Sequence, residues 1–354
     1  MVVTLRLRPS NCTQTPRPAT RTRQQQACAH TPPPVIQHHG AACAMNSLLQ
    51  KVGLLGARLQ TERPAAQTEV ATAAQPAILL VIQADAYDWV DIFAGCRLHD
   101  GRPVRVVQAG WDRLVVTAES PAMSGTSPVL VHVRPGGSGG RGSEGSTIKP
   151  DFLLVRNEVR GGPHTDDWRG ALYGLMYAGV PSVNSLQSIY SFLERPIVQG
   201  ELHKIQRRLG VEQFPVIAQS YFATHTAMMY GGAFPAVLKV GHAHAGLGKM
   251  RVADHHDWED VRSVVAMTDG KYCTAEPYMH GEYDLRIQKI GPHLRVFRRT
   301  DMSGNWKTNT GCSTVEEVAP TAAYRLWAEE AATLFGGLDI CTVDVLHERE
   351  TGKE

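Results

Sequence analysis

The sequence predicts an α/β protein in which a small domain with a parallel sheet precedes a larger α+β domain. Apolar runs of strand length lie at 78–82, 104–107 and 152–155, with charges at or near their ends, which is typical of buried parallel strands. A segment with helical periodicity follows the third run. Further along, Lys239 lies inside an apolar strand that leads into a glycine-rich loop, a pattern suited to binding phosphate.

The composition is that of a globular protein without a strong net charge. The 354 residues are 43% hydrophobic and 20% charged, enough to bury the cores of two domains. A formal net charge of +2 does not favour nucleic acid, so we expect no nucleic-acid partner. The seven cysteines form no CxxC pair, which favours a reducing cytoplasmic compartment over a zinc site or a disulfide framework.

The first 75 residues form a basic tail rich in Pro, Thr, Gln and Ala, and we expect them to be disordered. Within them, 45–59 has leucine and valine spacings compatible with an amphipathic helix. Such a helix could contact a partner or a membrane surface, or form only transiently.

The small domain is expected over 76–185. After its third strand, a helix from Trp168 to Met176 is predicted to stop at Gly179 and Pro181, and a short strand follows at 180–183. The Gly/Ser-rich run at 136–146 is predicted to be a flexible insertion, because its glycine spacing opens no helix.

The larger domain is expected over 186–354. Its first helix should begin at Pro196, and a later helix should be capped by Asp257. The remaining expected elements are strands at 272–278, 285–290, 294–298 and 338–346 and a helix at 323–334. Because a hairpin-like Glu-Thr-Gly-Lys sequence follows the last strand and the sequence then stops, we expect that strand to have an open edge and the domain to be incomplete at its C-terminus.

The glycine-rich loop carries the main functional signal. A lysine among apolar strand residues loses hydration unless an anion or a carboxylate faces Lys239. Gly246 and Gly248 allow main-chain N–H groups to approach phosphate oxygens, and Lys249 closes the loop. The spacing differs from a Walker A loop, which needs a Ser or Thr after its lysine. The alternative is an edge strand in which Lys239 extends to water.

Three further segments carry polar groups that suit a nucleotide. The stiff Glu276-Pro277-Tyr278 connection can present main-chain groups to a purine while Glu276 reaches a ribose, although it could also be a simple kink at a strand end. A loop of small residues frames Lys307 and Asn309, with Arg299 just upstream, and suits terminal phosphates. Asp344 lies among apolar residues of the last strand and is a candidate ligand for the metal that accompanies ATP.

Several long strings resemble the synapsins, a family of the ATP-grasp superfamily. They are Lys239-Val-Gly-His-Ala-His-Ala-Gly-Leu-Gly-Lys249, Tyr283-Asp-Leu-Arg-Ile-Gln-Lys-Ile-Gly291, Ser303-Gly-Asn-Trp-Lys-Thr-Asn-Thr-Gly311 and Phe335-Gly-Gly-Leu-Asp-Ile-Cys341. The similarity covers roughly residues 77–354. It implies a small pre-ATP-grasp parallel-sheet domain followed by an ATP-grasp α+β domain.

The resemblance also implies a function. It implies an ATP-binding phosphoprotein, peripheral on the cytoplasmic face of synaptic vesicles in presynaptic terminals, which clusters vesicles, contacts actin and regulates neurotransmitter secretion as a homo-oligomer, expected to be a dimer. ATP would be bound with a divalent cation, Ca²⁺ or alternatively Mg²⁺. In this picture ATP binding is regulatory, so we expect an ATP-binding protein rather than an enzyme. The alternatives are an ATP-grasp carboxylate–amine ligase and an interaction protein with a degenerate nucleotide site.

The resemblance assigns roles to individual residues. Lys239 would hold the α and β phosphates under the loop from Gly246 to Lys249, and Glu276 would lie at adenine and ribose. Arg299 and Lys307 would reach the γ-phosphate, and Asp344 would share the metal.

The chain also departs from the family pattern. Arg195 stands where the family has a phosphate-binding lysine, and Asp344 stands where a glutamate is usual. The strand with a second metal-binding carboxylate and the N-terminal Arg-Arg-x-Ser segment are missing. Because Met45-Asn46 resembles the start of the family, residues 1–44 are expected to be read-through of untranslated sequence.

Overall fold

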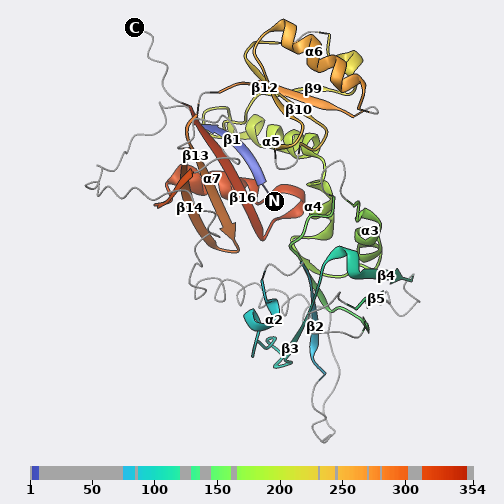
Figure 1. Ribbon diagram of the computed structural model, residues 1–354. Helices are drawn as coiled ribbons and strands as arrows, with labels where there is room; N and C mark the ends of the chain where they lie inside the picture. Colours follow the sequence, from blue (N-terminus) through green and yellow to red (C-terminus); the bar gives the residue numbers. More distant parts are fainter. Residues whose placement is uncertain are drawn as a thin grey trace, which may run out of the picture.

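The computed structural model describes residues 2–7, 75–83, 87–119, 129–135, 145–160, 166–229, 232–243, 246–268, 271–279, 281–301 and 313–348 (Figure 1). Within them, four hydrophobic clusters form around three larger sheets, two of them on opposite faces of the first sheet. No helix of the described part of the chain is long and apolar enough to cross a membrane.

The first sheet is parallel and has the strand order β3-β2-β7-β8. Its strands are β2 (Ala77–Ile82), β3 (Val104–Ala109), β7 (Phe152–Val155) and β8 (Ser182–Val183). Leu80 and Ile82 pack on one face, whereas Leu79 and Val81 pack on the other, because side chains alternate along a strand. The prediction of buried parallel strands is thereby confirmed.

Helices and a small antiparallel sheet surround this parallel sheet. The helices are α2 (Trp89–Ile92), α3 (Arg169–Tyr177) and α4 (Leu186–Ser191), with a 3₁₀ turn η2 (Trp111–Arg113). The antiparallel sheet has the order β4-β5-β6, with β4 (Leu114–Ala118), β5 (Val129–Val133) and β6 (Ser146–Ile148). Helix α3 confirms the predicted helix and ends at Tyr177, and its C-cap Ala178 comes just before Gly179, which has a positive φ of 66°.

The second sheet is antiparallel, in the order β11-β10-β12-β9, and α6 covers it. Its elements are β9 (Ser220–Phe222), η3 (His225–Ala227), β10 (Ala236–Val240), β11 (Lys249–Val252), α6 (His255–Ala266) and β12 (Cys273–Pro277). Trp258 of α6 is fully buried against Leu238 and Cys273.

The predicted cap of α6 is wrong. Asp254, not Asp257, is the N-cap residue, because its extended backbone lets its carboxylate accept bonds from the N–H groups of His256 and Asp257 at 2.8 and 3.1 Å. Asp257 lies in the first turn, and its carboxylate accepts a bond from the N–H group of Ala253 at 2.8 Å.

The third sheet has the order β1-β16-β13-β14-β15 and packs against α5 and α7. Its elements are β1 (Val2–Leu7), α5 (Arg195–Leu209), β13 (Gly281–Ile290), β14 (His293–Asp301), β15 (Ser313–Val318), α7 (Ala322–Ala331), η6 (Leu334–Gly336) and β16 (Ile340–Glu348). Helix α5 has Pro196 in its first turn, as predicted.

Two expectations about the chain ends do not hold for this sheet. Residues 2–7, expected to be disordered, form β1, which runs parallel to β16 from the pair Val2 and Thr342 to the pair Leu7 and His347 (Figure 1). The edge of β16 that was expected to be open is therefore paired. The physical reason is that a row of unpaired main-chain N–H and C=O groups is a template for any extended segment that reaches it.

The side chain of Asn184 joins the first sheet to the third by hydrogen bonds. Asn184 follows β8, is buried, and has a positive φ of 53°. Its amide donates to the carbonyl of Ile340 at 2.7 Å and accepts from the N–H group of the same residue at 2.9 Å. The first residue of β16 is thus fixed to the end of the first sheet.

Candidate functional site

The glycine-rich loop connects β10 to β11 and brings two lysines together. Lys239 and Lys249 lie directly opposite each other in the register of these strands. Like charges in directly opposed positions repel, so this pair needs a negative group nearby. Gly246 and Gly248 have φ values of 81° and 73°, which favour glycine. At Gly248 a Cβ atom would also come within 3.2 Å of the carbonyl oxygen of Val240.

A buried carboxylate supplies part of the negative charge. The Nζ atom of Lys239 lies 2.7 Å from Oε1 of Glu276 on the neighbouring strand β12, and the two side chains are only 14% and 11% exposed. The second oxygen of Glu276 accepts a bond from the Gln219 amide at 3.2 Å. The alternative of a lysine extending to water is therefore wrong for Lys239. Its ammonium group is held in place, and Lys249 opposite it adds a second positive charge.

Arg195, the first residue of α5, reaches the same loop from another element. Its Nε donates to the carbonyl oxygen of His242 at 2.6 Å. The guanidinium is thus brought to the beginning of the glycine-rich loop. In this structure it holds the loop main chain.

Tyr278 follows β12 and is fixed by its main chain and its ring. Its N–H group donates to the carbonyl oxygen of Pro235 at 2.9 Å, and the Arg251 guanidinium lies 4.3 Å from its ring centroid. An aromatic ring and an arginine plane at the end of β12 suit a flat ligand group.

A second group of charges lies on one face of the third sheet. Arg299 Nε lies 2.5 Å from Asp284, and Arg286 Nε lies 3.1 Å from Asp344, with a further approach of 3.9 Å between Arg299 and Asp344. These side chains share a face because Asp284 is paired with Arg299, and Arg286 with Asp344, across the strands. Burial raises the pKa of Asp344, and the two arginines oppose this effect.

Two of the predicted site residues cannot be placed. Lys307 and Asn309 lie outside the described residues. Among the other candidates, Arg195, Lys239 and Glu276 are linked to one loop or its strands, whereas Arg299 and Asp344 lie together on the third sheet.

Sequence reasoning missed other polar residues at these places. Gln219 and Asp284 contact predicted site residues directly, and Asp284 is only 3% exposed. The i, i+2 spacing of Asp284 and Arg286 places both side chains on one face of a strand, but it does not show which residues they contact. Gln219 gives no sequence signal.

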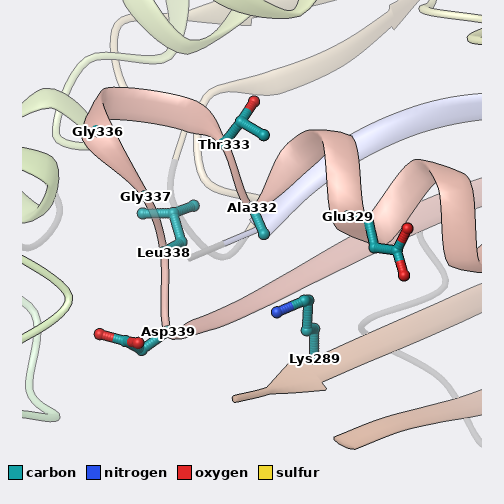
Figure 2. A pocket seen from close by; sticks show the side chains of 8 residues that line it. All are labelled: Lys289, Glu329, Ala332, Thr333, Gly336, Gly337, Leu338 and Asp339. Carbon is teal, nitrogen blue, oxygen red and sulfur yellow. The ribbon is translucent and has the colours of Figure 1, made fainter. Parts of the chain in front are cut away.

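A separate hollow of about 420 Å³ lies at the edge of the third sheet where β13 ends and β16 begins (Figure 2). Lys289 lines it from β13, and Glu329, Thr333 and Asp339 line it from α7 and the turn that follows. Side chains alternate along β13, so Lys289 lies on the opposite face from Arg286 and Asp284, which is the helix-covered face of the sheet. This hollow is therefore not part of the charged face that carries Asp344.

Comparison with known proteins gives matching family models for both parts of the chain. Residues 72–182 match the synapsin pre-ATP-grasp domain, and residues 184–354 match the synapsin ATP binding domain. Synapsin of Drosophila melanogaster is 35% identical over 326 residues, which cover 88% of this chain and 31% of that protein. The chain thus spans about a third of the length of this relative.

Solved structures of lower sequence identity are similar in outline. The ATP-grasp ligase PsnB, complexed with a minimal precursor, has a TM-score of 0.49 and 16% identity, covering 77% of this chain and 86% of that one. VanG D-Ala:D-Ser ligase from Enterococcus faecalis has a TM-score of 0.49 and 11% identity, covering 78% and 90%.

The fold and the matched domains define an ATP-binding protein of the ATP-grasp class, which takes ATP with a divalent cation. The pre-ATP-grasp domain precedes the ATP-binding domain, as the sequence predicted. The chain belongs to the synapsin family.

Proposed function

We propose that this protein binds ATP as a regulatory ligand and acts on the cytoplasmic face of synaptic vesicles, where it clusters vesicles, contacts actin and regulates neurotransmitter secretion. Its membership in the synapsin family supports this proposal. The observation that carries the ATP site is the direct opposition of Lys239 and Lys249 beneath the glycine-rich loop. A polyphosphate carries several negative charges and could therefore face both ammonium groups at once.

The ligand is proposed to lie along the loop and reach toward the third sheet. Lys239, Lys249 and Arg195 would neutralise the phosphates, and the main-chain N–H groups at Gly246 and Gly248 would point at phosphate oxygens. Tyr278 and Glu276 would flank the adenine and ribose. Arg299, with Lys307 and Asn309, would take the terminal phosphate.

The chemistry of the charged face fits a hard divalent cation. Such ions prefer carboxylate oxygens, and Asp344 offers a carboxylate whose charged form is destabilised by burial. Asp344 would hold the cation, with Asp284 beside it on the same face. The bound cation would neutralise phosphate charge. We propose Ca²⁺ as this ion, with Mg²⁺ as the alternative.

The ATP site can be tested by ligand-induced thermal stabilisation. ATP with Ca²⁺ is expected to raise the unfolding temperature of the wild type, and Lys239→Ala should lose this increase; Lys204→Ala, an exposed lysine of α5, is the matched control. An equal increase in wild type and Lys239→Ala would contradict the assigned site. ADP release in the presence of an acid and an amine would instead indicate a ligase.

The cellular role needs a separate measurement. Purified synaptic vesicles mixed with the protein are expected to cluster, as followed by light scattering, and actin filaments should co-sediment with it. A protein that binds ATP but neither vesicles nor actin would contradict the vesicle role without affecting the ATP site. The expected dimer can be checked by analytical ultracentrifugation.

A further inference from the structure

A carboxylate outside the proposed nucleotide contacts links the two domains. Glu194 precedes α5, and its Oε1 lies 2.5 Å from Nη1 of Arg160, in the part of the chain that matches the pre-ATP-grasp domain. Its Oε2 accepts a bond from the hydroxyl of Tyr272 at 2.8 Å. Glu194 is the N-cap residue of α5, yet its side chain caps no helix N–H group. Both of its oxygens are therefore directed to side chains far away in the sequence.

The partners of Glu194 hold the beginning of the glycine-rich loop. The carbonyl oxygen of Tyr272 accepts a bond from the N–H group of Gly241 at 2.8 Å. Arg195, the residue next to Glu194, donates to the carbonyl oxygen of His242 at 2.6 Å. The first two loop residues are thus fixed by Tyr272, which is hydrogen-bonded to Glu194, and by Arg195, which follows Glu194 in the chain.

These contacts form a closed ring from Glu194 through Tyr272, the loop and Arg195 back to Glu194. The Tyr272 hydroxyl is a neutral donor to a charged acceptor, and its pKa is raised by burial and by this bond, so it stays protonated and keeps donating. Arg160 neutralises the carboxylate from the other domain. A ring closed in this way limits the positions that the loop main chain can take before a ligand arrives.

We propose that Glu194 is a positioning residue, which presets the glycine-rich loop for its ligand and makes that setting depend on Arg160 of the pre-ATP-grasp domain. This inference rests on the proposed ATP site, because the ligand of the loop is taken to be ATP. Glu194 does not touch the ligand. It acts through Tyr272 and Arg195, so the arrangement of the two domains and the affinity for ATP are coupled in both directions.

The test removes the two contacts of the Glu194 carboxylate one at a time. Tyr272→Phe deletes only the hydroxyl that Glu194 accepts, and Arg160→Gln removes the charge on its other oxygen. Each is expected to weaken ATP binding, measured by calorimetry, about fivefold to tenfold. A loss of this size is expected because each variant removes one bond to a charged group, and this bond affects the ligand only through the loop. Matched controls are Tyr190→Phe, from the tyrosine pair between α3 and α4, and Arg102→Gln, from an exposed ion pair in the first domain.

A second readout separates positioning from general destabilisation. Amide hydrogen exchange of the loop in the nucleotide-free protein is expected to accelerate in Tyr272→Phe and Arg160→Gln, while exchange in α7 stays at the wild-type rate. The combined variant should lose less affinity than the product of the two single losses, because both substitutions act through the position of the same carboxylate, that of Glu194.

The outcomes distinguish this inference from the proposed function. If the wild type does not bind ATP, the proposed function fails, and loop exchange alone then decides the role of Glu194. If the wild type binds ATP but Tyr272→Phe changes neither affinity nor loop exchange, the inference is wrong and the ATP site stands. Faster exchange throughout the protein, α7 included, would also overturn it.

Discussion

Removing the charge of Lys239 should destabilise the folded protein strongly, because the buried Glu276 would lose its ion-pair partner. In Lys239→Met the apolar part of the side chain is kept, but a carboxylate that is 11% exposed loses its partner at 2.7 Å. Breaking a buried ion pair by removing one partner costs about 3–5 kcal/mol. The bond from Gln219 to Glu276 remains and offsets about 1 kcal/mol, so we expect a loss of about 3 kcal/mol in the free energy of unfolding.

The assay is urea denaturation followed by tryptophan fluorescence, since Trp258 is buried in the core beneath this strand pair. Adding Glu276→Gln to Lys239→Met removes the stranded charge and should restore about 2 kcal/mol. The matched control is Lys204→Met, whose ion pair with Glu201 leaves the lysine 63% exposed and should be worth about 0.3 kcal/mol. A double variant no more stable than Lys239→Met would refute the reasoning.

Three further predictions follow from single residues. Gly248→Ala should destabilise by about 1–2 kcal/mol in thermal or urea unfolding, because of its positive φ and the close Val240 carbonyl, whereas Gly200→Ala in α5, with open space around it, should be neutral or slightly stabilising. Asn184→Gly keeps the backbone conformation but leaves the N–H and C=O groups of Ile340 unpaired, and should cost about 2 kcal/mol by the same measurement. Burial raises the pKa of Asp344 above its ordinary 3.8, so the folded protein binds this proton more tightly than the unfolded chain. Its contribution to stability therefore falls as pH rises from 3.8 through the folded-state pKa. Asp344→Asn should lack this decline, and an unchanged slope of unfolding free energy against pH would contradict the assignment.

Local patterns predicted much of the fold and the centre of the site. The apolar runs at 78–82 and 152–155 could be read as buried strands because burial on both faces removes polar residues along the whole run. Lys239 stood out for the same reason, as a charge where the pattern demands an apolar side chain. Signals of this kind depend only on neighbours in the chain.

The remaining features depend on contacts between distant residues. The partner of Lys239 is set by the register of β10 and β12, which no short segment encodes, so Glu276 was assigned to the ribose without its ion pair being foreseen. Glu194 and Tyr272 are 78 residues apart and meet only after the ATP-binding domain has folded. Asp254 was missed because Asp257 has the same chemistry three residues later, and only the backbone conformation decides between two such caps.

The pairing of β1 with β16 has a consequence for how the protein is made. Val2–Leu7 leave the ribosome long before the strand they join, which is complete only when His347 has also left the exit tunnel. Until then these six residues lack their native partner, and the third sheet cannot gain this ladder. Contacts between such distant parts of a chain form slowly, so the strands of the first two sheets, which are synthesised in between, can pair before this ladder forms.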